Sequence, residues 1–230
     1  MHLHRAIYLR FWLPIYRVFA LRYVQKTRQW RSHGIQLEVP AGVFHPGIYF
    51  STPIFMNFLQ HIDFQSKKVL DIGTGSGALA IFAAKKGAVT MGVDINPLAV
   101  ATALRNVASN HLSFPVIESD LFNGVPEGQF DYLLVNPPYY PKDAKNDAEK
   151  AFFAGEGLSY FTRFFVECRP FIAPSTTIWM ILSEDCNWGF IVERARLASF
   201  EATVEYEQRH WGERLFVGQF KMTTPSALVV

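Results

Sequence analysis

Short apolar runs alternate with helix-like stretches along most of the chain after residue 60. These runs are apolar throughout, which is typical of strands that are buried on both faces in a parallel sheet. The pattern predicts strands over 68–72, 89–93, 114–117, 132–135 and 177–182, and helices over 78–86, 97–109 and 158–167. The chain is therefore expected to form an α/β fold with a mostly parallel sheet and helices on both faces.

The two ends of the chain follow different patterns. Residues 201–207 and 214–221 alternate between apolar and polar positions and flank a Trp-Gly turn, which predicts an antiparallel hairpin at a sheet edge. Near the N-terminus, 6–23 indicates two short amphipathic helices and 34–42 is hairpin-like. We therefore expect a helical and hairpin extension over 1–60, acting in substrate recognition, and a main domain over 61–230.

The composition fits this division and excludes several classes of protein. Of the 230 residues, 50% are hydrophobic and 18% are charged, which fits one domain with a large core and excludes global disorder. Arginines and Pro14 interrupt the apolar N-terminal segment, so neither a transmembrane span nor a secretory signal is expected. Cys168 and Cys186 lack ligand spacing and the histidines are scattered, so we expect reduced thiols, no metal site and a cytoplasmic location.

A glycine-rich connection follows the first predicted strand of the main domain. Gly73, Gly75 and Gly77 lead directly into a predicted helix. Glycines allow a tight turn and let a ligand approach without meeting a Cβ atom. On its own this segment fits a plain strand-to-helix turn, a nicotinamide dinucleotide site or another nucleotide-like cofactor.

Carboxylates end the next two predicted strands. Asp94 lies at a position where it could accept both hydroxyls of a ribose, or could instead cap the helix that begins near Pro97. Asp120 could accept a hydrogen bond from an adenine amine, with Ile95 and Leu121 on the two faces of the ring. The order of these residues favours an adenosine-containing cofactor.

The sequence Asn136-Pro137-Pro138-Tyr139 is the most specific feature of the chain. The prolines remove two backbone donors and fix the backbone, leaving a rigid lip rich in acceptors where a strand ends. The Asn136 side-chain oxygen and the Pro137 carbonyl could accept the N–H groups of a planar amide or amine, and Tyr139 could stack on it. The nitrogen lone pair would then face an electrophile such as a sulfonium methyl group, a chemistry for which nicotinamide enzymes have no use.

With these residues in place, the chain resembles class I S-adenosylmethionine-dependent methyltransferases of the Asn-Pro-Pro-Tyr group. Within that group it is most similar to HemK-like protein-glutamine N5-methyltransferases and to the methyltransferase small domain of rRNA base methylases. The resemblance runs from about residue 35 to the end. It implies a Rossmann-like seven-stranded sheet, mostly parallel, with a C-terminal antiparallel hairpin and with S-adenosyl-L-methionine as cofactor. We expect the cofactor to be bound by Asp71, Gly73, Thr74, Gly75, Gly77, Asp94, Ile95, Asp120, Leu121 and Asn136, and the acceptor by Asn136, Pro137 and Tyr139.

The identity of the acceptor depends on the N-terminal segment, where the chain departs from the family. Pro46-Gly47 replaces the usual Pro-Arg, and only about 35 residues precede the region of resemblance. A protein glutamine is the leading hypothesis for the acceptor. An RNA or DNA base is the second, because Arg22, Lys26, Arg28 and Arg31 could contact phosphates. A small molecule is the third, and the oligomeric state is not predicted.

Overall fold

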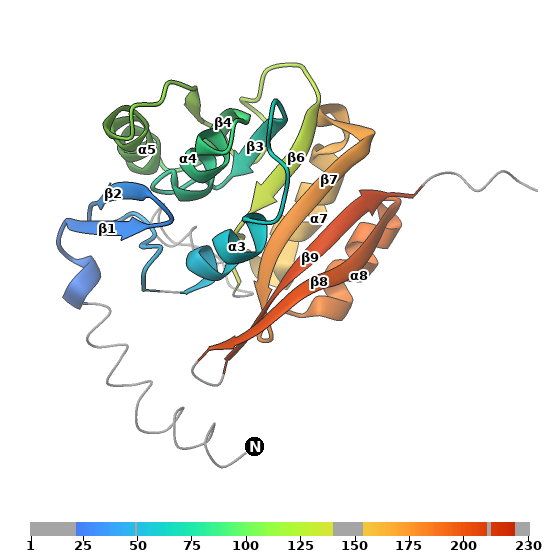
Figure 1. Cartoon of the computed structure of the whole chain (residues 1–230). Coiled ribbons are helices and arrows are strands. Elements are labelled where there is room, and N and C mark those ends of the chain that lie inside the picture. Colours follow the sequence, from blue (N-terminus) through green and yellow to red (C-terminus); the bar gives the residue numbers. More distant parts are fainter. Residues whose placement is uncertain (1–21, 49, 140–153, 211–212, 224–230) are drawn as a thin grey trace, which may run out of the picture.

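The computed structural model describes residues 22–48, 50–139, 154–210 and 213–223. Within this part of the chain, a seven-stranded sheet forms the centre and a two-stranded hairpin lies beside it (Figure 1). The order of the strands across the large sheet is β5-β4-β3-β6-β7-β9-β8. Their bounds are β3 (Lys68–Ile72), β4 (Val89–Asp94), β5 (Val116–Glu118), β6 (Phe130–Val135), β7 (Ile172–Ser183), β8 (Phe200–His210) and β9 (Glu213–Met222).

The sheet is mixed in the way that the sequence predicted. All neighbours from β5 to β7 are parallel, whereas β9 pairs antiparallel with both β7 and β8. The Rossmann-like seven-stranded sheet with a C-terminal antiparallel hairpin is therefore confirmed. β7 begins five residues before the predicted strand. Its first residues are partly exposed and not all of them are apolar, so the apolar pattern did not predict the start of the strand.

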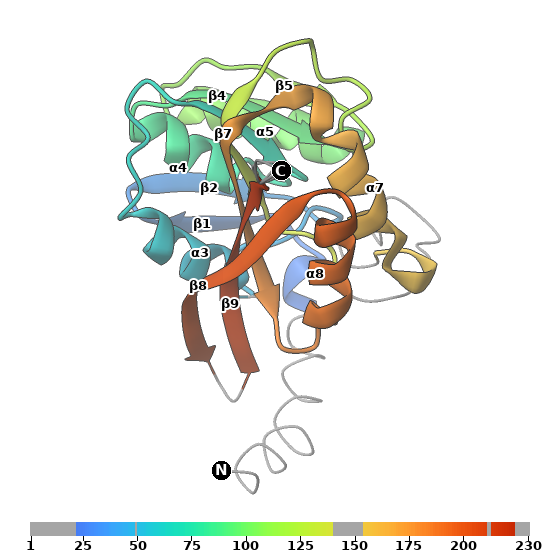
Figure 2. The same cartoon turned by 90° about the vertical axis from the view of Figure 1, so that its right-hand side faces the viewer.

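Helices cover both faces of this sheet (Figures 1 and 2). One face carries α3 (Ser51–Leu59), α4 (Ala78–Lys85) and α5 (Pro97–Ser109), and the other carries α7 (Ser159–Glu167) and α8 (Trp188–Leu197). Short 3-10 helices, η2 (Glu156–Leu158) and η3 (Arg169–Phe171), flank α7. Leu133 and Leu134 are both fully buried but belong to different hydrophobic clusters, one on each face. This two-sided burial explains why the strands are apolar throughout.

The separate hairpin consists of β1 (Arg28–Ser32) and β2 (Ile35–Val39). Its turn lies at His33 and Gly34, which have φ values of 51° and 71°, as two-residue hairpin turns require. The hairpin-like segment predicted over 34–42 was therefore placed too late, because the polar sequence of β1 gives no strand signal. β2 buries alternate residues against α4 and α5, in the same cluster as the main domain. The predicted division of the chain into an extension over 1–60 and a main domain over 61–230 stays a prediction.

The structure also bears on the cysteines, on membrane-spanning helices and on the predicted N-terminal helices. Cys168 and Cys186 are buried free thiols, and burial raises their pKa values to about 12 and about 11. Across the described residues, no helix is long and apolar enough to cross a membrane. The amphipathic helices predicted over 6–23 lie almost wholly outside those residues.

Candidate active site

The predicted site residues gather where the strand order changes direction. β3 has β4 on one side and β6 on the other, and all three strands are parallel. Ile72 pairs with Val135 at the carboxyl ends of β3 and β6. The glycine loop and Asn136 therefore begin at the same level of the sheet, side by side. Open α/β sheets bind their ligands at such a point.

The three glycines of the loop have different environments. All have positive φ values, 69° at Gly73, 56° at Gly75 and 86° at Gly77. A Cβ atom on Gly73 would meet nothing within 4 Å, so the backbone is open on the side where a ligand could approach. A Cβ atom on Gly77 would lie 3.3 Å from the Cβ of Ala103, so Gly77 lets α4 pack closely on α5.

Asp71 lies beneath the loop and holds its shape. It is 1% exposed, and its Oδ2 accepts hydrogen bonds from the Thr74 hydroxyl at 2.7 Å and the Ala80 N–H at 3.1 Å. Burial raises the pKa of this carboxyl to about 7, although both hydrogen bonds oppose the shift. Its Oδ1 is buried and has no hydrogen-bond donor among the described residues. Thr74 is thus bound to Asp71 rather than turned outward.

Asp94 connects the glycine loop to the start of α5. One carboxylate oxygen accepts from the Gly75 N–H at 2.8 Å and the other from the Asn96 N–H at 2.9 Å. Asn96 itself caps α5, because its side chain accepts from the Leu98 N–H at 2.9 Å. The alternative role of Asp94 as the helix cap is therefore wrong. A carboxylate has about four lone-pair sites, so Asp94 keeps acceptor capacity for a ribose.

Asp120 forms an ion pair that the sequence did not predict. Arg163 of α7 donates to both of its oxygens at 3.2 and 3.1 Å, and also pairs with Glu167 at 2.8 Å. The Asp120 side chain remains 43% exposed. The neighbouring Leu121 is buried, with a positive φ of 50°. Arg163 fixes the direction of the acid that we expect to meet adenine.

The side chain of Asn136 is held from both ends of its amide. Its Nδ2 donates to the hydroxyls of Ser51 at 3.1 Å and Thr52 at 3.3 Å, both at the start of α3. Its Oδ1 accepts from the Tyr139 hydroxyl at 3.0 Å, which also lies 3.3 Å from the carbonyl oxygen of Ile181. Hydroxyl groups thus engage both ends of the amide, with its oxygen on the side of Tyr139 and its nitrogen on the side of α3.

Sequence reasoning missed the role of Ser51 and Thr52. Both are almost completely buried, at 1% and 3% exposure, although each is a small polar residue. A Ser-Thr pair at the start of a helix is a recognisable signal for a helix terminus, but not for a contact with a residue more than 80 positions away. Tyr139 was expected to stack on the acceptor. In the structure its hydroxyl also orients Asn136, and the Oδ1 atom keeps a second lone pair for a substrate N–H.

Comparisons with known proteins identify a family and several relatives. The family model described as methyltransferase small domain matches residues 34–158. A Methanocaldococcus jannaschii protein, provisionally described as a protein N5-glutamine methyltransferase, is 37% identical over 65% of this chain and 77% of its own length. The release factor glutamine methyltransferase of Deinococcus radiodurans is 30% identical over 61% of this chain, which spans only 54% of that enzyme. The structure of a Thermus thermophilus 16S rRNA guanine-N2 methyltransferase matches with a TM-score of 0.64 at 18% identity, covering 86% of this chain and 50% of the other.

The match to the family model covers more than half of the chain. Together with the mixed seven-stranded sheet, it defines the class of protein as a Rossmann-like S-adenosylmethionine-dependent N-methyltransferase. The chain belongs to the methyltransferase small domain family.

Proposed function

We propose that the enzyme transfers a methyl group from S-adenosylmethionine to the side-chain amide nitrogen of a protein glutamine. The observation that carries the proposal is the fixed Asn136 amide, whose oxygen can accept an N–H from a planar nitrogen. Two relatives point in the same direction, because both are described as glutamine methyltransferases. The amide of a glutamine offers two N–H groups, which fit the Asn136 oxygen and the Pro137 carbonyl.

The chemistry depends on turning the nitrogen toward the methyl group. An amide nitrogen is a poor nucleophile because its lone pair is delocalised into the carbonyl. If Asn136 and Pro137 each accept one N–H, the amide is fixed with its face toward the cofactor, and Tyr139 limits its movement. When bound, S-adenosylmethionine supplies a methyl group on a positively charged sulfur, which becomes neutral after transfer, and the methylated nitrogen gives up one N–H proton to solvent. The protein contributes in-line positioning and fixed dipoles.

The residues around the glycine loop fit this cofactor. Asp71 Oδ1 is a buried acceptor with no partner among the described residues, which suits a nearby ammonium group such as that of the methionine part. Gly73 leaves the backbone open, and Asp94 keeps acceptor capacity for the ribose hydroxyls. Asp120, oriented by Arg163, would accept from the adenine amine, with Ile95 and Leu121 beside the ring.

A labelling experiment tests the proposal. The enzyme is incubated with S-adenosylmethionine carrying a radioactive methyl group and with cell extract, alongside the Asn136→Ala variant as control. We expect label in a protein band that survives nuclease and is absent with the variant. Label found only in RNA would refute the proposed acceptor while leaving the methyltransferase class intact.

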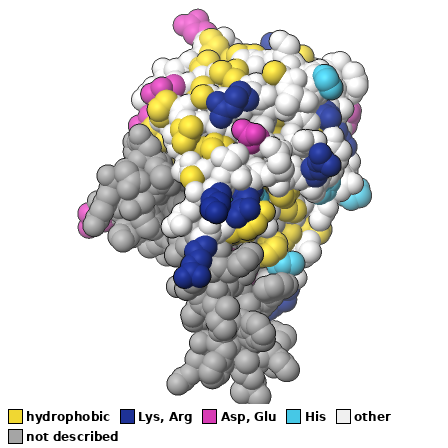
Figure 3. Space-filling model, turned by 90° about the vertical axis from the view of Figure 1, so that its left-hand side faces the viewer, with side chains coloured by type: hydrophobic (Ala, Val, Ile, Leu, Met, Phe, Trp, Pro, Cys, Tyr) yellow, Lys and Arg dark blue, Asp and Glu magenta, His cyan; other side chains and the backbone are white. Residues whose placement is uncertain are grey.

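A second acceptor, an RNA base, is favoured by one observation. Lys and Arg side chains gather on the face formed by the β1–β2 hairpin and α5, with few carboxylates among them (Figure 3). Among the described residues, Arg31 and Lys85 have no carboxylate within ion-pair distance, whereas Arg163, Arg196 and Arg214 elsewhere each have at least one. These unpaired cations could contact phosphates.

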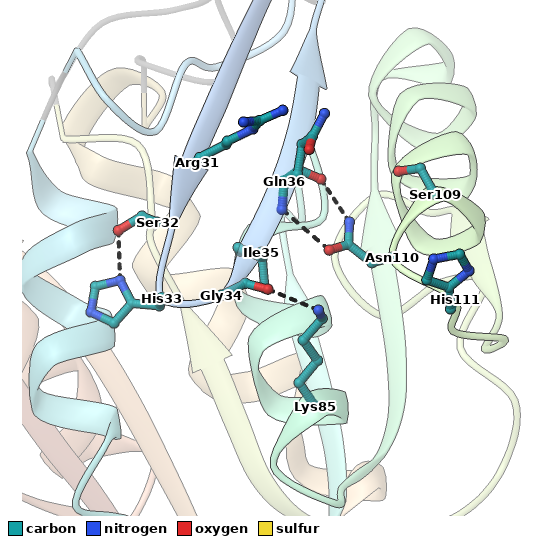
Figure 4. A pocket seen from close by; sticks show the side chains of 10 residues that line it. All are labelled: Arg31, Ser32, His33, Gly34, Ile35, Gln36, Lys85, Ser109, Asn110 and His111. Atoms are coloured by element: carbon teal, nitrogen blue, oxygen red, sulfur yellow. Dashed lines mark hydrogen bonds between the residues drawn. The ribbon is translucent and has the colours of Figure 1, made fainter.

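Two of these cations line a shallow depression of about 600 Å³ between the hairpin turn and the C-terminal ends of α4 and α5 (Figure 4). α5 has 13 residues and begins beside the glycine loop, so the depression at its far end lies about 20 Å from that loop. An RNA acceptor predicts that binding of a labelled RNA weakens with salt and drops in the double variant Arg31→Glu, Lys85→Glu. Arg196→Glu, on the other face, is the control. Binding equal in both variants would remove this candidate.

A further inference from the structure

Among the described residues, no further strand pairs with the outer edge of β2. β1 occupies one edge of β2, and the backbone groups of Gln36 and Glu38 point to the other edge, toward α5. Unpaired edge groups that are buried need partners. In this protein the partners are side chains rather than a strand.

Two asparagines of α5 supply these partners. Asn106 and Asn110 lie four residues apart, hence on one face of the helix. Asn106 Oδ1 accepts from the Glu38 N–H at 2.9 Å, and its Nδ2 donates to the Glu38 carbonyl at 3.0 Å. Asn110 makes the same pair of bonds with Gln36, at 3.2 and 2.6 Å (Figure 4). Each carboxamide therefore acts like the peptide group of a neighbouring strand.

The two asparagines differ in their remaining hydrogen bond. The second Nδ2 proton of Asn110 is donated to the Asn106 carbonyl within α5, at 2.8 Å. The second Nδ2 proton of Asn106 is donated to the Ser76 carbonyl, at 2.9 Å. Ser76 lies between Gly75 and Gly77 in the glycine loop and is 3% exposed. Only Asn106 thus joins the hairpin to the loop expected to bind the cofactor.

The Asn106 amide is fully satisfied in this position. It is 2% exposed, its oxygen faces an N–H, and its nitrogen faces two carbonyls, so the reverse orientation would set acceptors against acceptors. On the opposite side of Ser76, the Gly75 N–H is already held by Asp94. The loop is therefore fixed from one side by Asp94 and from the other by Asn106.

The segment that follows β2, residues 40–46, continues this connection toward the glycine loop. The Gly42 carbonyl accepts from Asn96 Nδ2 at 3.1 Å, so the start of α5 also holds the chain that leaves the hairpin. Phe44 then reaches the loop, where its Cβ would lie 4.0 Å from a Cβ on Gly75. The asparagines of α5 thus hold the hairpin, the segment 40–46 and the glycine loop together by hydrogen bonds.

From this geometry we infer that Asn106 is a positioning residue for methyl transfer, which sets the glycine loop and couples cofactor binding to the N-terminal hairpin. The coupling is reciprocal, since whatever orders the loop also orders the hairpin through the same side chain. An acceptor that contacts the hairpin would therefore be linked in affinity to a cofactor that contacts the loop.

A matched pair of variants tests this inference in the 230-residue chain. Asn106→Ala and Asn110→Ala each remove a pair of bonds to β2, but only the first frees Ser76. The affinity for S-adenosylhomocysteine is measured by calorimetry and the melting temperature by scanning fluorimetry. We expect both variants to lower the melting temperature, and Asn106→Ala alone to weaken binding, by about tenfold as for one lost buried hydrogen bond. Equal affinities in the two variants would overturn the inference.

Two further measurements keep the inference testable if Asn106→Ala does not fold. Asn106→Asp keeps the size of the side chain and the acceptor for the Glu38 N–H but removes both donors, so it is expected to weaken binding as well. In the wild-type protein, adding S-adenosylhomocysteine is expected to slow hydrogen exchange of the Glu38 amide more than that of the Gln36 amide. No difference between these two amides would contradict the coupling.

Discussion

The hydroxyls of Ser51 and Thr52 provide a direct test of how Asn136 is oriented. The double variant Ser51→Ala, Thr52→Val removes both acceptors of the Asn136 Nδ2 group with little change in volume. The carboxamide then keeps only the Tyr139 hydroxyl at its oxygen end, and can rotate away from the direction that a substrate N–H requires.

The size of the effect follows from the two hydrogen bonds. Their lengths, 3.1 and 3.3 Å, indicate ordinary neutral bonds, of which the second is the weaker. At about 1 kcal/mol each, their loss removes about 2 kcal/mol of orientation energy. If this energy is expressed in the transition state, kcat falls by about 30-fold. Each single variant is expected to lose about fivefold.

The assay compares turnover with cofactor binding. Initial rates of transfer from radiolabelled S-adenosylmethionine into the proteins of nuclease-treated extract give kcat and KM, and calorimetry gives the affinity for S-adenosylhomocysteine. Thr90→Val, a buried hydroxyl of β4 outside the site, is the control for a general loss of stability. A double variant with unchanged kcat, or one that loses no more than Thr90→Val, would refute the positioning of Asn136 by α3.

Three other predictions concern the loop and the buried thiols. Asp71 has a pKa raised from 3.8 to about 7 by burial, so the folded state favours its protonated form. The free energy of unfolding of the wild type relative to Asp71→Asn should be greatest below pH 3.8 and should fall as the pH rises through 7, by at most about 4 kcal/mol. Urea titrations of both proteins from pH 4 to pH 8 measure this difference. A difference in free energy of unfolding that does not change with pH would contradict the prediction. Gly77→Ala should lower the melting temperature more than Gly73→Ala, because the new Cβ at position 77 would contact α5. Gly73→Ala should mainly weaken binding of S-adenosylhomocysteine. A larger loss of melting temperature in Gly73→Ala than in Gly77→Ala would exclude the assigned roles. Cys168 and Cys186 should react with Ellman's reagent at pH 8 only after unfolding, and rapid reaction of the native protein would show that the thiols are accessible.

The sequence predicted the elements whose signals are local. α5 was predicted at its observed bounds because Pro97 marks its first turn and its apolar spacing is regular. β3 was predicted equally well, since five residues that are mostly apolar precede the glycine loop. β1 gave no such signal, because its sequence is polar and it is stabilised by pairing with β2 and by packing on the domain.

The side-chain contacts within the site could not be read in the same way. Asn136 meets Ser51 across 85 positions, Asp120 meets Arg163 across 43, and Asn106 meets Glu38 across 68. Each partner is a common surface residue type, and its role depends on how α3, α7 and the hairpin dock on the sheet. Such docking is decided by burial of apolar faces, which specifies the neighbouring element but not the polar pair that forms at its end.

The fate of the transferred methyl group tests the central claim most directly. Labelled product made by the wild-type enzyme is hydrolysed in strong acid, which cleaves side-chain amides. A methyl group on a glutamine amide nitrogen is then released as methylamine, which becomes volatile once the hydrolysate is made alkaline, and we expect the label to be recovered in this form. Label that stays on an amino acid or on a nucleic-acid base after hydrolysis would contradict it.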